Sequence, residues 1–359
     1  MRGDIACFRA ALLAWYDAHA RNLPWRGDIS PYHTWVSEIM LQQTQAATVI
    51  PYYLRFIERF PTVQTLAAAP IDDVLKSWEG LGYYRRAHNL HKTARIIVEQ
   101  HDGELPRDEK ALLALPGIGR YTAGAIRSIA FGDSAPVLDG NVKRILARLD
   151  DIETSIDERE TEKRLWARAA DLLDPHRPGD FNQAMMELGA TICLPASPAC
   201  DVCPVADFCL ARARGVQTQR PVRTPRQRIP HYDVAAGVVW HATDPERFLI
   251  AQRPAGGMLG GLWEFPGGKQ EPGEDLPQTL VRELMEELEI RVTVGEKFAE
   301  VKHAFTHFRI TLHAFHARHI AGEPQRIGVD DWRWVTLDEL DEFAFAKTDR
   351  AIIAAMKGA

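Results

Sequence analysis

Two short stretches in the middle of the chain carry groups suited to chemistry on a phosphate-bearing substrate. The first, residues 115–126, places Gly117 and Gly119 directly before an apolar helical pattern. Glycines that open a helix leave backbone N–H groups free at the positive end of its dipole, where a phosphate binds. The second stretch begins with Asp139, which precedes another helical pattern containing Asn, Lys and Arg. A phosphate site beside a carboxylate suits chemistry on the sugar of a nucleic acid.

A second carboxylate, that of Glu38, lies among apolar residues of a predicted helix that include Trp35 and Ile39. Burial beside such residues raises the pKa of a carboxyl group toward neutrality, which suits it to donate a proton. The alternative for Glu38 is a solvated surface position.

Asp139 is a favoured N-cap residue, and capping alone is its alternative role. A carboxylate about 4 Å from a sugar cation, at an effective dielectric of about 20, contributes roughly 4 kcal/mol, or about a thousandfold in rate.

Four cysteines lie within 17 residues in a 6-2-5 spacing, namely Cys193, Cys200, Cys203 and Cys209. So dense a group is a poor match for unrelated buried thiols. A four-cysteine zinc site is one interpretation, although zinc ligands usually come as two short pairs separated by a longer loop. Four thiolates leave no open position for a substrate, so a structural centre is favoured over a hydrolytic one.

The length of 359 residues predicts about two domains. The net charge of −6 argues against a nucleic-acid partner until its distribution is considered. Residues 231–359 carry 14 basic and 21 acidic residues, so the excess of acid lies there. Six arginines and no acid lie between Phe208 and Tyr232, and local basic patches set phosphate affinity. No apolar run approaches the roughly 18 residues of a membrane span, and no secretory signal opens the chain.

Hydrophobic periodicity divides the chain into a helical part and a mixed part. Helical patterns cover residues 34–60, 74–76 continuing into 85–100, 112–131, 141–149, 162–173 and 181–192. Residues 213–230 are rich in Arg, Gln, Thr and Pro and are interpreted as a linker. Strand patterns follow at 234–240, 248–252, 292–301 and 308–316, with helices at 276–288 and 347–356. We therefore expect a multidomain protein, with an all-α domain over 1–212 and an α+β domain over 231–359.

Several segments in this order resemble the MutY-type adenine DNA glycosylases over nearly the whole chain. They are Leu23-Pro-Trp-Arg26, Ser37-Glu-Ile-Met-Leu-Gln-Gln-Thr44, Gly80-Leu-Gly-Tyr-Tyr-Arg85, Leu115-Pro-Gly-Ile-Gly-Arg-Tyr-Thr122, Leu138-Asp-Gly-Asn-Val-Lys-Arg144, Asn182-Gln-Ala-Met-Met-Glu-Leu-Gly189 and the cysteine loop. The resemblance implies a helix-hairpin-helix glycosylase domain whose four cysteines bind a [4Fe–4S] cluster. It also implies a Nudix-like C-terminal domain.

The resemblance implies roles for individual residues. Glu38 would protonate the adenine leaving group and Asp139 would stabilise or capture the sugar cation, supported by Tyr121 and Asn141. Related enzymes that also cut the strand carry a lysine at the place of Tyr121, so a monofunctional glycosylase is implied. Residues expected to line the adenine pocket are Trp25, Arg26, Leu41 and Glu187. Those expected at the gap and on the DNA are Gln43, Tyr83, Pro116, Gly117 and Gly119.

For the pocket and gap residues a plainer interpretation stays open. Trp25, Leu41 and Tyr83 could be ordinary core residues, and Glu187 could be a charge on a helix surface. In the resembled family the C-terminal domain reads 8-oxoguanine opposite adenine, and the matching segment here includes Phe305, Thr306 and His307. Thr306 stands where serine is common, which keeps the hydroxyl and adds a methyl group.

The second domain also carries a nearly complete Nudix box between Gly268 and Ile290. Glu283, Glu286 and Glu287 fall on one helix face, where three carboxylates could hold magnesium against a diphosphate. The one departure is Glu289, where the motif has glycine. An alternative function is therefore magnesium-dependent hydrolysis of oxidised nucleoside triphosphates by this domain. A solvated acidic helix face, with leucines packing inward, is the plainer interpretation.

The sequence thus predicts an adenine-specific DNA N-glycosylase that flips adenine out of duplex DNA and hydrolyses it where it is mispaired with 8-oxoguanine or guanine. The expected product is an abasic site. We expect a monomer without membrane contact, in the cytoplasm of a bacterium and associated with the nucleoid. A mismatch-binding protein without activity and a pyrimidine-type glycosylase with lyase activity are the competing classes.

Overall fold

The computed structural model describes residues 4–27, 29–225 and 229–358. Its contacts divide the chain into a first unit, Met1–Ala68 with Asn89–Arg226, and a second unit, Ala69–His88 with Gln227–Ala359. Within the described ranges, no helix combines the length and apolar character needed to cross a membrane. Arg226 and Arg228 of the predicted linker lie outside the described residues.

The first unit is helical, as the sequence predicts. Its helices are α1 (Ile5–His19), α2 (Pro31–Leu41), α3 (Ala46–Arg59), α4 (Val63–Ala68), most of α6 (Arg85–Gln100), α7 (Glu109–Ala114), α8 (Arg120–Ala125), α9 (Gly140–Leu149), α10 (Arg159–Leu172), α11 (Pro178–Thr191) and α12 (Leu210–Ala213). The single helices predicted over 34–60 and 112–131 are wrong in length. The first breaks between α2 and α3, and the second divides into α7, α8 and a π-helix, η2 (Ile126–Ala130).

The break inside 112–131 is the hairpin between α7 and α8. Gly117 adopts φ +80, and a Cβ there would lie 2.8 Å from the Cβ of Asn89. Both the left-handed backbone and the close neighbour require glycine at this position. The turn therefore ends α7 and delivers Gly119 to the N-cap of α8.

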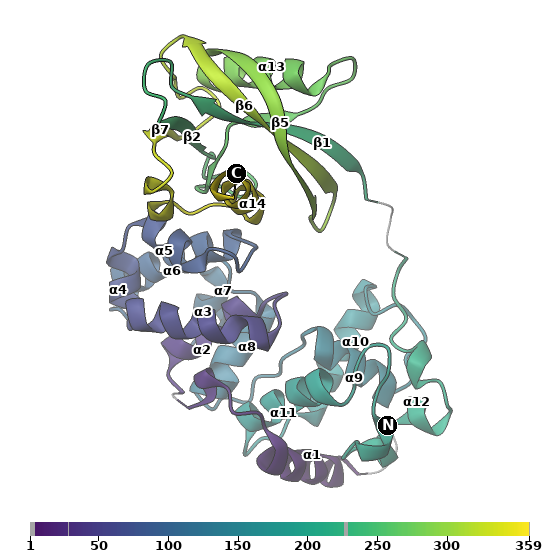
Figure 1. Cartoon of the computed structure of the whole chain (residues 1–359). Helices are drawn as coiled ribbons and strands as arrows, with labels where there is room; N and C mark the ends of the chain where they lie inside the picture. Colours follow the sequence, from purple (N-terminus) through teal and green to yellow (C-terminus); the bar gives the residue numbers. More distant parts are fainter. Residues whose placement is uncertain (1–3, 28, 226–228, 359) are drawn as a thin grey trace. The chain divides into compact units, whose positions relative to one another are not determined.

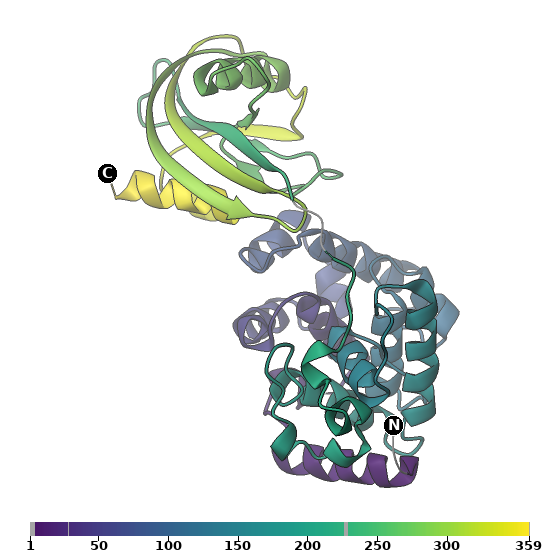
Figure 2. The ribbon, with the colours of Figure 1, turned by 90° about the vertical axis from the view of Figure 1, so that its right-hand side faces the viewer.

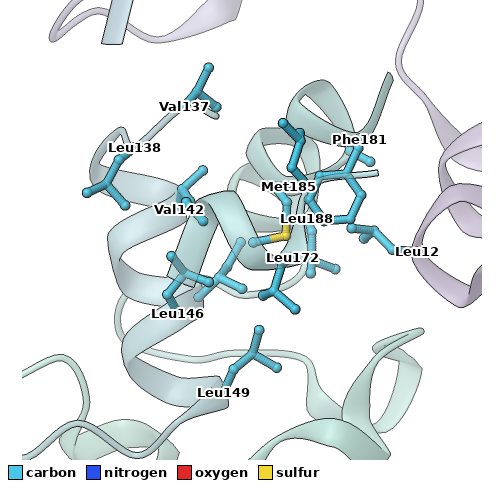
Figure 3. Close-up of a cluster of buried hydrophobic side chains, with 14 of the residues drawn as sticks. Leu12, Val137, Leu138, Val142, Leu146, Leu149, Leu172, Phe181, Met185 and Leu188 are labelled. Carbon is cyan, nitrogen blue, oxygen red and sulfur yellow. The ribbon is translucent and has the colours of Figure 1, made fainter. Parts of the chain in front are cut away.

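A hydrophobic core joins α1, α9, α10 and α11, as Figure 3 shows. Leu12, Leu146, Leu172 and Leu188 are each at most 1% exposed. Burying a leucine side chain contributes roughly 1.5–3 kcal/mol, so this cluster fixes the direction of α9. The residue before α9 is Asp139, which is thereby held in place by the core.

The predicted linker 213–230 is not a free segment where it is described. Arg220 binds Asp151, with 2.8 Å between its Nε and a carboxylate oxygen, and the N–H of Ile156 donates to the carbonyl of Val222 at 3.0 Å. Arg214 binds the same aspartate at 2.6 Å. A composition poor in apolar residues predicted a loose chain here. Instead, ion pairs to the buried Asp151 help to attach residues up to 225 to the first unit.

The second unit is built on a seven-stranded mixed sheet within the described residues, with order β3-β2-β1-β6-β5, while β4 pairs with β1 and β7 with β2. Its strands are β1 (His231–Trp240), β2 (Phe248–Gln252), β3 (Trp263–Glu264), β4 (Gly267–Lys269), β5 (Arg291–Ala304), β6 (Arg309–Ala321) and β7 (Asp331–Val335). The predicted strands and helices are confirmed within a few residues. The short β3 and β4 were not predicted, because two or three residues show no alternation. The strand β7 was not predicted either.

Two helices cover opposite faces of this sheet, α13 (Leu276–Leu288) and α14 (Lys347–Lys357) (Figures 1 and 2). Leu280, Leu284 and Leu288 of α13 are fully buried against one face. Ile352 and Ile353 of α14 pack against the other. Neighbouring residues of β1 point alternately to the two cores, as the pleat of a strand requires.

One part of the domain boundary differs from the sequence prediction. Residues 69–88, which hold α5 (Ile71–Trp78) and the turn that follows it, were expected in the helical domain but share more contacts with the C-terminal sheet. The reason is a set of polar side chains in this segment that bind backbone groups of the C-terminal part: Lys76 binds the carbonyl of Phe343, Glu79 binds the N–H of Phe345, and His88 binds the carbonyl of Gly260. These contacts connect chain segments far apart in sequence, and no local pattern reports them.

Candidate active site

Glu38 lies on α2 with 4% of its surface exposed, so the surface alternative for this residue is wrong. The Tyr121 hydroxyl on α8 donates a hydrogen bond of 2.5 Å to Oε2 of Glu38. Burial raises the pKa of Glu38 to about 7, although the Tyr121 hydrogen bond acts in the opposite direction. A carboxyl group with this pKa can both give and take a proton near neutrality.

Tyr121 holds Glu38 in one orientation. Its hydroxyl also lies 3.1 Å from the sulfur of Met186. Burial, followed by the charges of Glu38 and Asp139, raises the pKa of Tyr121 well above its ordinary value. The phenol therefore stays protonated and remains a hydrogen-bond donor.

Asp139 is the N-cap of α9, and it is also part of the site. One carboxylate oxygen accepts from the N–H of Val142 at 2.7 Å, and the other accepts from the Asn141 side chain at 3.0 Å. Burial raises the pKa of Asp139, while these hydrogen bonds lower it in part. Arg144 donates to the amide oxygen of Asn141 at 2.8 Å, which fixes the amide that orients Asp139. Capping and a site position thus coexist in one residue.

A pocket of about 1260 Å³ in the first unit gathers most of the predicted residues. Those that line it are Trp25, Arg26, Glu38, Leu41, Gln43, Gly117, Gly119, Tyr121, Asp139, Asn141 and Glu187. The volume is ample for a nucleoside. Pro116 and Tyr83 do not line it, and Phe305, Thr306 and His307 belong to the second unit. The carbonyl of Pro116 instead accepts from Thr93 at 2.8 Å and supports the hairpin turn.

Glu187 is buried at one wall of this pocket, with 1% exposure, so the interpretation as a helix-surface charge is wrong. Burial alone would raise its pKa, but Arg21 at 2.5 Å and Arg26 at 2.9 Å lower it. Glu187 is therefore an ionised acceptor inside the pocket. Arg21 was not predicted as a site residue. Its closeness in sequence to Trp25 and Arg26 could have indicated that it lies at the same pocket.

Two residues predicted to contact the DNA near the gap share an unusual backbone. Gln43 has φ +57 and Tyr83 has φ +51, in the left-handed region that side-chain-bearing residues rarely adopt. Tyr83 is 46% exposed, which excludes the interpretation as a core residue. Residues with such a strained backbone cluster at active sites and ligand-binding segments.

The Phe305–Phe308 segment forms the turn between β5 and β6. The N–H of Phe305 donates to the carbonyl of Phe308 at 2.8 Å, and the two rings lie 4.8 Å apart. Thr306 and His307 are exposed at the tip. Within the second unit, the hydroxyl oxygens of Tyr83 and Thr306 are 3.4 Å apart.

The cysteine loop brings four thiols into one electrostatic environment. Burial, together with the charges of Cys193, Cys200 and Cys209, raises the pKa of the Cys203 thiol to about 12. Arg148, 2% exposed, donates to the sulfur of Cys193 at 3.2 Å and supplies compensating charge.

The four cysteines of this loop are the candidate ligands of a metal centre. In the part of the chain that is described, no group of three or more His, Cys, Asp or Glu side chains is arranged to hold a metal ion. Four cysteine thiolates are the ligand set of a [4Fe–4S] cluster and also of a structural zinc site.

The Nudix box forms its helix, α13, and three of its acids are paired with Arg282. Arg282 binds Glu274 at 2.6 Å, Glu283 at 3.0 Å and Glu286 at 3.1 Å. Among the described residues, no group of three or more acids, histidines or cysteines is arranged to hold a metal ion. Glu289 ends α13 with φ +58, which explains why the motif has glycine there.

The chain matches two protein families and resembles several known proteins. Residues 36–170 match the HhH-GPD superfamily of base excision DNA repair proteins, and residues 235–355 match the NUDIX domain. The adenine DNA glycosylase of Homo sapiens is 36% identical, over 99% of this chain and 75% of that protein. The adenine DNA glycosylase of Rattus norvegicus is 39% identical, over 94% of this chain and 75% of that protein.

Two solved structures resemble the helical part. A thermostable thymine-DNA glycosylase is 29% identical with a TM-score of 0.54, over 58% of this chain and 97% of that one. An endonuclease III bound non-covalently to DNA has a TM-score of 0.51 at 23% identity, over 60% of this chain and 100% of that one, which shows the fold alone.

Proposed function

The chain belongs to the adenine DNA glycosylases, and from this premise we propose that it excises adenine mispaired with 8-oxoguanine or guanine in duplex DNA. Family membership establishes an adenine-specific DNA N-glycosylase of base excision repair that binds double-stranded DNA. The observation that carries the proposed chemistry is the buried Glu38, whose pKa is raised to about 7 in one pocket with Asp139.

The proposed reaction follows from these two carboxyl groups. The enzyme first extrudes the adenosine, because its glycosidic bond is inaccessible within the duplex. Protonated Glu38 transfers its proton to a ring nitrogen of adenine, and the C1′–N9 bond breaks with its electron pair leaving on the base. Ionised Asp139 stabilises the sugar cation. Water then attacks C1′ and gives its proton to Glu38, which restores the enzyme and leaves an abasic site.

The pocket residues support selection of adenine. Glu187, ionised between Arg21 and Arg26, can accept a hydrogen bond from the amino group of adenine. A purine that carries a carbonyl oxygen in place of this amino group would lose the hydrogen bond, because the oxygen and the Glu187 carboxylate are both acceptors. Unpaired buried polar groups of this kind discriminate strongly between substrates.

Tyr121 supports a monofunctional mechanism. A strand-cutting glycosylase needs an amine that forms a Schiff base with the sugar. Tyr121 provides a neutral hydroxyl whose proton is committed to Glu38. We therefore expect no borohydride-trapped covalent complex and no strand break before alkaline treatment.

The test is single-turnover excision from duplexes that carry adenine opposite 8-oxoguanine, guanine, cytosine or thymine. Product is measured with and without alkaline treatment. Fast release opposite 8-oxoguanine and guanine, slow release opposite cytosine and thymine, and cleavage only after alkali are expected. The Glu38→Gln variant serves as the inactive control. Equal rates on all four duplexes would overturn the proposed mispair specificity, and cleavage without alkali would overturn the monofunctional mechanism.

The cofactor, assembly state and location remain parts of the proposal. The four cysteines Cys193, Cys200, Cys203 and Cys209 lie in one loop, and their charges raise the pKa of neighbouring thiols among them, which supports a [4Fe–4S] cluster with a structural role. We propose a monomer that acts in the bacterial cytoplasm in association with the nucleoid. Iron analysis and size-exclusion chromatography with light scattering test the first two statements.

Hydrolysis of oxidised nucleoside triphosphates by the C-terminal domain is the second candidate. The feature that favours it is Glu287, whose pKa burial and the charge of Glu283 raise to about 7, because a divalent cation would relieve this repulsion. The ion pairs of Arg282 count against it. Magnesium-dependent release of pyrophosphate from 8-oxo-dGTP that disappears in Glu286→Gln would establish this activity.

A further inference from the structure

The turn that carries Tyr83 is held rigidly from within the second unit. Gly80 and Gly82 have φ +92 and +78, and Tyr83 follows with φ +51. The carbonyl of Gly82 accepts from the indole N–H of Trp78 and from the Arg86 guanidinium, each at 3.1 Å. Two donors on the Gly82 carbonyl oxygen therefore fix the backbone of this turn. The position of the whole turn depends in addition on the contacts of Glu79, the residue that precedes it.

Glu79 immediately precedes the turn and is bound to the C-terminal part of the chain. One carboxylate oxygen accepts from the N–H of Phe345 at 3.0 Å and from Nε of Arg350 at 2.5 Å. The other accepts from the second guanidinium nitrogen of Arg350 at 3.0 Å. Burial alone would raise the pKa of Glu79, but these bonds lower it. Glu79 is thus an ionised residue in a bidentate pair with α14, the geometry that gives such pairs direction as well as strength.

Neighbouring contacts close the network around the same backbone segment. Lys76 binds Glu79 at 3.0 Å and donates to the carbonyl of Phe343 at 2.8 Å. Arg350 donates to that same carbonyl at 3.0 Å. At the other end of residues 69–88, a ring nitrogen of His88 lies 2.8 Å from the carbonyl oxygen of Gly260. The segment is therefore attached to the sheet domain on both sides of the Tyr83 turn.

This attachment places two exposed side chains next to each other. The Tyr83 hydroxyl lies 3.4 Å from the Thr306 hydroxyl, although 223 positions separate them in the chain. Their proximity is therefore a result of tertiary structure and not of closeness in the sequence. Tyr83 comes from the turn after Glu79, and Thr306 comes from the hairpin tip between β5 and β6.

We propose that the Glu79–Arg350 pair is a positioning device for mispair recognition, which keeps the Tyr83 turn in register with the Thr306 hairpin. The two side chains then form one preassembled surface for the strand opposite the excised adenine. This inference rests on the proposed function, because it concerns how the partner base is read. Glu79 touches neither the base nor the reacting sugar, so it acts through Tyr83.

A purely structural pair would give a different result. Losing it would lower the melting temperature and reduce excision from every duplex by a similar factor. A positioning pair changes the ratio between duplexes, because only the oxidised partner offers the contact that a displaced surface fails to make. The discriminating quantity is therefore the ratio of single-turnover rates for adenine opposite 8-oxoguanine and opposite guanine, measured on the full-length holoenzyme.

Glu79→Gln removes the charge and retains an oxygen for the N–H of Phe345. We expect this variant to lower the 8-oxoguanine to guanine ratio by about tenfold, which corresponds to 1.4 kcal/mol, with the guanine rate changed less than about twofold. Arg350→Met should give the same loss, and the two changes combined should lose no more than either alone. Asp341→Asn is the matched control, because Asp341 binds the same arginine at 3.3 Å but its side chain is 72% exposed.

The outcomes separate this inference from the proposed function. If the wild-type enzyme shows no preference for 8-oxoguanine over guanine, the proposed function fails first. If the wild type shows the preference and Glu79→Gln keeps the full ratio, only the positioning role is wrong. Additive losses in the double variant, or equal losses on both duplexes, would likewise reject it. If Glu79→Gln folds poorly, Arg350→Lys, which retains one donor, should show an intermediate ratio.

Discussion

At the scale of single residues, catalysis depends on the proton of Glu38, and its raised pKa predicts the pH profile. Excision requires Glu38 protonated, with a pKa of about 7. The single-turnover rate should therefore fall above pH 7, by roughly tenfold per pH unit. Asp139 must be ionised, and its raised pKa predicts a second decline on the acidic side. A rate that keeps rising from pH 7 to pH 9 would contradict this assignment.

The same carboxyl group should cost stability above neutral pH. The pKa of Glu38 is about 7 in the fold against 4.5 in its ordinary state, so the folded protein binds this proton more tightly than the unfolded chain. Its stabilising contribution is complete below pH 4.5 and disappears as pH rises through 7. We expect Glu38→Gln to raise the free energy of unfolding by roughly 3 kcal/mol at pH 8 and by much less at pH 5. Denaturation of both proteins at both pH values measures this difference.

Gln43 offers a third residue-scale prediction, because its left-handed backbone is strained. Glycine removes a strain of about 1–2 kcal/mol and loses roughly 0.5–1 kcal/mol through unfolded-chain entropy. Gln43→Gly should therefore stabilise the protein slightly while slowing excision at least tenfold, since the side chain that faces the pocket is gone. Asp102, also left-handed and exposed outside the pocket, is the control, and Asp102→Gly should stabilise without loss of activity.

At the scale of elements, α9 links the core to the cysteine loop through Arg148. Its guanidinium donates to the carbonyls of Leu194 at 2.7 Å, Pro195 at 2.8 Å and Arg220 at 3.0 Å, besides the sulfur of Cys193. Arg148→Met would remove the donor from these partly buried acceptors, and each fully buried acceptor left unpaired costs about 1–3 kcal/mol, which is an upper bound here.

We expect Arg148→Met to be purified with most of its iron missing and with a lower melting temperature. Iron content per chain and visible absorbance are the measurements. Arg212→Ala is the control, because its partner Asp207 is 95% exposed and such surface pairs contribute little. Full iron occupancy in Arg148→Met would show that the loop holds its shape without this residue.

At the scale of the whole molecule, residues 69–88 depend on the C-terminal part for their polar partners. Deleting residues 227–359 removes the groups that bind Lys76, Glu79 and His88. We expect amide hydrogens of residues 71–84 to exchange much faster in the truncated protein. The later part of α6, residues 89–100, lies in the first unit and should keep its protection. Equal exchange of 71–84 in both proteins would show that these contacts contribute nothing to local stability.

Much of the molecule was predictable because local signals specify it. Period-3.6 and period-2 patterns predicted the helical part and the main strands. Gly117 marked the hairpin, because only glycine adopts that turn easily. The apolar neighbours of Glu38 predicted its burial, and the position of Asp139 before a basic helix predicted its N-cap. The 6-2-5 spacing of four cysteines predicted one thiol-rich loop. Each of these features depends on residues only a few positions apart, so the local sequence alone determines it.

The tertiary structure alone decided the rest, because each remaining feature joins distant positions. The orientation of Tyr121 toward Glu38, the two arginines on Glu187 and the attachment of residues 213–225 all depend on side chains brought together by packing. The contact of Tyr83 with Thr306 spans most of the chain. Composition predicted a linker and a simple boundary at residue 212, whereas charge pairs across folded segments set the actual division. Local sequence specifies elements, and the energy of long-range contacts determines which of them share a unit.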